Sequence, residues 1–71
     1  MIKTLQRPLH QQRVFYEKVD LDTKTEALRK FITGAALDGL PTAEQSRLRR
    51  QHVAMCEYST VLGERIAAWV L

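Results

Sequence analysis

VFYEKVDLDTKTEALRKFI, residues 14–32, is the stretch that decides the fold of this 71-residue chain. At about 100° per residue its apolar side chains fall on one stripe of a helix: Val14, Leu21, Leu28 and Ile32, with Phe31 at the edge. No Gly or Pro interrupts the run, and Pro8 is well placed near the first turn. We therefore predict one long amphipathic helix that ends at about Thr33, with Gly34 as its C-cap.

A second apolar stripe follows after a short break. Residues 35–40 can form one helical turn, and a second helix of about 28 residues then begins near Pro41 or Thr42. Thr42 and Gln45 have the spacing of a capping box, and Gly63 is predicted to let another backbone approach. The stripe consists of Leu48, Met55, Leu62, Ile66 and Trp69. The sequence therefore predicts an all-α fold in which two long helices form an antiparallel hairpin.

The size of the chain favours self-association. We expect a single helical domain over residues 1–71, with residues 1–7 as a loosely ordered arm. A chain of this length is marginally stable alone, and its one Cys cannot form an internal disulfide. A lone hairpin cannot enclose a core, and both the apolar run at residues 66–71 and the pair Phe15 and Tyr16 on the far side of the first helix are typical of subunit interfaces. We predict a symmetric homo-oligomer.

Charge and hydropathy limit the partners and the compartment. The net charge of +3, from 11 Lys and Arg against 8 Asp and Glu, permits an anionic ligand but is too small for a protein that coats DNA. The apolar run is too short to span a membrane, and the N-terminal residues lack the apolar core of a signal peptide. We expect a cytoplasmic protein.

The sequence carries no enzymatic motif. It has neither a Gly-rich phosphate loop nor an H-E-x-x-H motif. Cys56 has His52 four residues before it, which permits a nucleophile–base pair, but a small core residue is the favoured interpretation of a mid-helix cysteine. We predict no catalysis, no cofactor and no metal site.

Several polar residues break the amphipathic pattern. Glu17 and Lys24 project within the apolar arc, so Lys24 either reaches past the seam to an acid or is held for an anionic partner. Arg65 lies at the edge of the second stripe in a similar way, and His10 either stacks on a base or lies in solvent. Arg47, Arg49 and Arg50 form a basic cluster that is either a solvated face or a phosphate contact.

The order of these residues resembles a family of very small tailed-phage proteins that includes the anti-CBASS cyclic-nucleotide sponges. The resemblance covers roughly residues 9–66. In the first helix it rests on His10-Gln11-Gln12-Arg13-Val14, Glu17-Lys18, Leu21-Asp22 with Lys24, and Leu28 with Phe31-Ile32. In the second it rests on Glu44, Arg47-Leu48, Gln51, Met55, Tyr58-Ser59 and Val61-Leu62-Gly63-Glu64-Arg65-Ile66.

The resemblance implies a function and a site. Such sponges are all-helical hexamers that sequester the messengers of bacterial antiviral signalling, without cleaving them, in the host cytoplasm. Lys24 matches the lysine that contacts phosphates of cyclic dinucleotides such as cyclic GMP-AMP, and His10 stands near the position of a base-stacking tyrosine. Arg65 matches the arginine that, repeated around a three-fold axis, binds cyclic trinucleotides such as cyclic tri-AMP. The physics agrees, because a phosphate in a partly apolar interface needs a fixed cation.

Two alternatives stay open. A nucleic-acid-binding protein that uses Arg47, Arg49 and Arg50 would bind with a steep salt dependence and little ligand discrimination. A helical adaptor would instead dock its apolar stripe on another protein.

Overall fold

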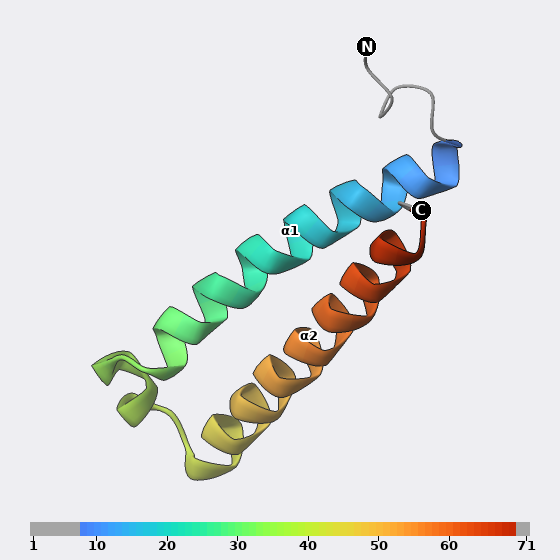
Figure 1. Ribbon diagram of the computed structural model, residues 1–71. Coiled ribbons are helices and arrows are strands. Elements are labelled where there is room, and N and C mark those ends of the chain that lie inside the picture. Colours follow the sequence, from blue (N-terminus) through green and yellow to red (C-terminus); the bar gives the residue numbers. More distant parts are fainter. Residues whose placement is uncertain (1–7, 70–71) are drawn as a thin grey trace.

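The chain forms an antiparallel helical hairpin (Figure 1). The computed structural model describes residues 8–69. Helix α1 spans Leu9–Ile32, the 3-10 helix η2 spans Ala35–Gly39, and helix α2 spans Thr42–Ala68. The hairpin measures 51 × 18 × 16 Å, with η2 at one end and the start of α1 beside the end of α2 at the other. The predicted all-α hairpin with a helical turn is confirmed, and the predicted arm at residues 1–7 lies outside the described residues.

The end of α1 is capped by Thr33 and not by Gly34. Thr33 keeps helical backbone angles, and its hydroxyl donates to the carbonyl of Arg29 at 2.8 Å. Gly34 has φ −100°, so it does not adopt the left-handed conformation that favours glycine at a helix end. The prediction that Gly34 caps this helix is therefore wrong, because the Thr33 side chain and extended backbone end α1 instead.

The predicted capping box at the start of α2 is also wrong. The N-cap is Pro41, whose carbonyl accepts from the backbone N–H groups of Glu44 at 2.9 Å and Gln45 at 3.0 Å. Thr42 is therefore already the first helical residue, and no side chain caps the helix. The Gln45 amide reaches back instead to the carbonyl of Leu40, at 2.9 Å.

The two helices meet along a seam with the 3-and-4 spacing of a coiled coil. Its members are buried or half-buried. Those of α1 are Val14, Lys18, Leu21, Thr25, Leu28 and Ile32, and those of α2 are Leu48, His52, Met55, Ser59, Leu62, Ile66 and Trp69. The apolar stripes predicted from the sequence are confirmed. Within each helix, however, polar seam residues are interspersed among the apolar ones: Lys18 and Thr25 in α1, and His52 and Ser59 in α2.

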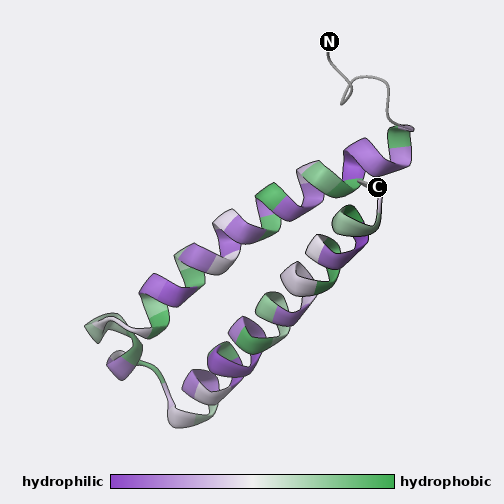
Figure 2. Ribbon diagram, in the orientation of Figure 1, coloured by the Kyte–Doolittle hydropathy of each residue, from purple (hydrophilic) through white to green (hydrophobic). Residues whose placement is uncertain are grey.

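The hairpin buries very little. Among residues 8–69 only Val14, Leu37 and Leu62 are buried, whereas Tyr16 and Val53 are 71% and 67% exposed. Hydrophobic and hydrophilic residues alternate along both helices (Figure 2). In the described part of the chain, neither helix is apolar over a length that would cross a bilayer.

Candidate functional site

The open end of the hairpin carries a cluster of rings around Trp69. The Trp69 ring centroid lies 6.2 Å from that of His10 and 6.4 Å from that of Phe15, with interplanar angles of 83° and 70°. Such edge-to-face geometry is the favourable one for aromatic pairs. The cluster ties the first two turns of α1 to the last turn of α2. Phe15 was predicted to face another subunit, but it is half-buried against Trp69 of its own chain, because the seam extends to the end of α2.

Arg65 lies one turn before Trp69 and contacts the same ring. Its guanidinium carbon is 6.0 Å from the Trp69 centroid, within the range of a cation–π interaction. Arg65 is exposed, and within residues 8–69 no carboxylate pairs with it. Its N–H donors therefore stay available to an anion while the indole restricts its position.

His10 and Arg65 both contact the Trp69 ring, whereas His10 lies far from Lys24. His10 is exposed to solvent, and its ring makes an edge contact with Trp69. Lys24 lies fourteen residues further along α1, which is about 21 Å of helix. One protomer therefore cannot bring His10 and Lys24 to the same small ligand.

Lys24 lies on the outside of α1. Its side chain is 67% exposed, and its ammonium pairs with Asp20 at 3.0 Å. The prediction that Lys24 and Glu17 project into the apolar arc is wrong, because Lys18 and Thr25 occupy the centre of the α1 seam and turn both residues outward. The alternative of an ion pair with an acid is confirmed for Lys24.

The charged residue that does enter the seam is Lys18. Its ammonium donates to the Ser59 hydroxyl at 2.7 Å, to the Ser59 carbonyl at 3.3 Å and to Asp22 at 3.1 Å. The Ser59 hydroxyl in turn donates to the other carboxylate oxygen of Asp22. The hydrogen bond from Ser59, and then that from Lys18, lowers the pKa of Asp22 below its usual value. The heptad spacing of Lys18 between Val14 and Leu21 is the sequence signal that the apolar pattern alone misses.

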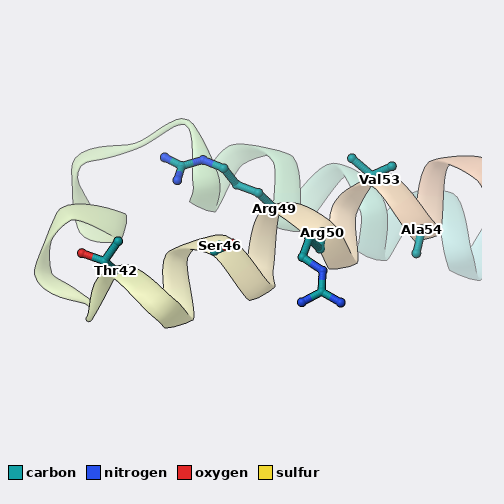
Figure 3. Close-up of a pocket in the computed structure, with 6 residues that line it drawn as sticks. All are labelled: Thr42, Ser46, Arg49, Arg50, Val53 and Ala54. Carbon is teal, nitrogen blue, oxygen red and sulfur yellow. The ribbon is translucent and has the colours of Figure 1, made fainter.

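The three arginines of the predicted basic cluster do not gather at one binding site. Arg47 pairs with Glu44 at 2.8 Å. Arg49 and Arg50 are exposed, line an open concavity on α2 and extend in different directions (Figure 3). The other residues that line this concavity are Thr42, Ser46, Val53 and Ala54. The solvated-face interpretation is confirmed for Arg47, while Arg49 and Arg50 stay unpaired within residues 8–69.

Cys56 does not lie in the core. It is exposed, with its sulfur 3.7 Å from Nε2 of His52, because its position falls on the flank of the α2 seam. The prediction of a small core cysteine is therefore wrong. Within the described part of the chain, no three His, Cys, Asp or Glu side chains gather as a metal site would require.

The protein is a small helical hairpin with polar residues in its seam and cationic side chains exposed at its surface. The chain belongs to the Sequestin family, whose model matches residues 8–68. No curated protein and no solved structure is similar enough to this chain to count as a match. Family membership supports a protein that sequesters a ligand over one that catalyses a reaction.

Proposed function

We propose that this protein binds and sequesters the cyclic oligonucleotide messengers of bacterial antiviral signalling without cleaving them. Membership of the Sequestin family supports the sequestering role, and the resemblance to the phage anti-CBASS sponges supports the ligand class. The proposal includes a symmetric homo-oligomer, a hexamer by that resemblance, in the bacterial cytoplasm. The small core of the described hairpin, with only three buried side chains, supports the need for further copies.

The observation that carries the proposal is the state of Arg65. Its guanidinium is placed by the Trp69 ring at 6.0 Å, and no acid in the described residues neutralises it. A planar guanidinium pairs with a phosphate through two parallel hydrogen bonds. Three copies around a three-fold axis would offer one guanidinium to each phosphate of a cyclic trinucleotide.

A cyclic dinucleotide needs a site built by two protomers. His10 and Lys24 lie about 21 Å apart along α1, so a base on His10 and a phosphate on Lys24 belong to different copies. The phosphate must also replace the Asp20 carboxylate, which pairs with Lys24 at 3.0 Å. Since that ion pair is exposed, it is weak, and its loss costs little.

Native mass spectrometry with a panel of cyclic di- and trinucleotides tests the proposal directly. A hexamer that gains discrete ligand masses, and releases the ligands unchanged on denaturation, is the expected result. A hexamer without ligand would redirect the search to protein partners. Binding of DNA or RNA with a steep salt dependence would favour the nucleic-acid alternative.

Matched variants assign the sites by calorimetry. Arg65→Ala should weaken cyclic trinucleotide binding at least tenfold, because a charge-assisted hydrogen bond contributes about 1.5–3 kcal/mol. Arg49→Ala removes another exposed arginine without an ion pair and should leave affinity unchanged. Lys24→Ala should weaken cyclic dinucleotide binding, whereas Asp20→Asn should strengthen it by releasing Lys24. Equal effects of Arg65→Ala and Arg49→Ala would refute the role of Arg65.

A further inference from the structure

Helix α2 has a second seam on the side that faces away from α1. At about 100° per residue its members lie within about 40° of the direction opposite Leu48. They are all exposed, and most are small: Ala43, Ser46, Arg50, Val53, Glu57, Val61, Glu64 and Ala68. We call this set the outer α2 face. Its 3-and-4 spacing is that of a helix surface which packs against another helix.

The charges on this face have no ion-pair partner within residues 8–69. Lys18, Lys24, Arg29 and Arg47 each pair with an acid three or four residues away. Arg50 has no acid at those positions, and neither Arg50 nor Glu57 forms an ion pair within residues 8–69. The two are seven residues apart, about 10 Å along the helix, which is too far for a pair within one chain.

We propose that the outer α2 face is the surface on which a second copy of this chain packs, with the two α2 helices antiparallel. A two-fold axis between Val53 and Ala54 places Arg50 opposite Glu57 of the partner subunit, twice, by symmetry. The same axis places Val53 against the second copy's Ala54, and Ser46 against its Val61. Arg50 and Glu57 are thus complementary across the axis, and the residues that meet at its centre are small.

The shape of the surface fits this packing. Val53 and Ala54 project to opposite edges of α2 in Figure 3, and both line the concavity that Thr42, Ser46 and Arg50 also line. Small side chains let two helices approach to about 8 Å between their axes. Val53 is 67% exposed in one hairpin, and it becomes the centre of the interface. The proposal rests on the self-association in the proposed function and names the surface that mediates it.

Charge reversal tests the ion pairs. Arg50→Glu or Glu57→Arg alone sets like charges against each other and should raise the dissociation constant of the α2–α2 contact at least tenfold at low salt. The double variant restores both pairs and should return to within about threefold of wild type by sedimentation. Lys30→Glu, the same charge change on α1, is the control and should leave this step unchanged. A double variant no better than the single ones overturns the pairing, since circular dichroism will report whether each variant keeps its helices.

Crosslinking tests the axis without reference to charge. Ala54→Cys in a Cys56→Ser background should form a disulfide-linked dimer, because residues beside the two-fold axis come within disulfide reach. Thr23→Cys, exposed on α1, should not. No crosslink at Ala54, or a chain that stays monomeric at all concentrations, overturns the proposal. If the crosslink forms but no cyclic nucleotide binds, the interface stands and the proposed ligand fails; if ligand binds without the crosslink, the reverse holds.

Discussion

Gly63→Ala distinguishes between two explanations for a glycine in the middle of α2. A Cβ at Gly63 would lie 3.6 Å from Cε and 4.0 Å from Nζ of Lys18, which is ordinary van der Waals contact. The sequence alone led us to expect a second backbone at this position, but the nearest atoms are the end of a lysine side chain, because Lys18 crosses the seam to reach Ser59. Alanine should therefore fit without displacing either helix.

The magnitude follows from helix propensity. Glycine in a helix interior is about 1 kcal/mol less favourable than alanine. For a domain of this size, a stabilisation of about 1 kcal/mol raises the melting temperature by roughly 4–8 °C. Thermal unfolding followed by circular dichroism measures the shift, at one protomer concentration because association changes stability.

Two further results test the expected rise in the melting temperature of Gly63→Ala. Ala27→Gly, the reverse change at an exposed position within α1, should lower the melting temperature by a similar amount. If Gly63→Ala also lowers the melting temperature, the reasoning from Lys18 is refuted. A loss seen only at concentrations where the chain associates would mean that another protomer approaches Gly63.

Leu62→Ala should destabilise the hairpin by about 2–5 kcal/mol in urea unfolding, because Leu62 is fully buried between the helices. Val19→Ala, at a position 66% exposed, should change stability by under about 0.5 kcal/mol; similar losses for both would mean that Leu62 is not the core residue it appears in the hairpin. Asp22→Asn should lose stability relative to wild type at neutral pH but not in acid. The pKa of Asp22 is lower in the folded chain than in the unfolded one. Its contribution to folding stability is therefore complete above the unfolded pKa of about 3.9, and it is lost as the pH falls through the folded pKa. A wild-type advantage that persists at about pH 2 would contradict this, and Glu17→Gln, at an exposed carboxylate with no ion pair within residues 8–69, is the control.

The amino-acid sequence was sufficient to predict the hairpin, because apolar periodicity specifies a long helix wherever no Gly or Pro interrupts it. It was insufficient for the middle of the seam. Apolar periodicity alone omits Lys18, Thr25, His52 and Ser59, since each is polar, and their burial depends on the opposite helix. Lys24 was misplaced for the same reason. On the helical wheel Lys24 points close to Phe31 and so was placed within the apolar stripe, yet Phe31 itself is 39% exposed.

The candidate site was only partly accessible from the sequence. The positions of Arg65 and Trp69 on one edge of α2 follow from their spacing of four residues. The contact of Trp69 with His10 does not, because it depends on how far one helix is displaced along the other. No pattern within a single helix contains that displacement, so the ring cluster required the fold.

The displacement of the helices is itself specified by the polar residues of the seam. An apolar seam of evenly spaced Leu and Ile would tolerate a slip of one heptad, since similar residues would meet again. A slip of α2 along α1 would separate Lys18 from Ser59 and leave an ammonium in the seam with fewer partners, which is costly. We infer that the Lys18–Ser59–Asp22 contacts select one register. That register sets Trp69 against His10 and Phe15, and so fixes where Arg65 is presented. A polar layer near the middle of the hairpin thus determines the geometry of the cation at its end.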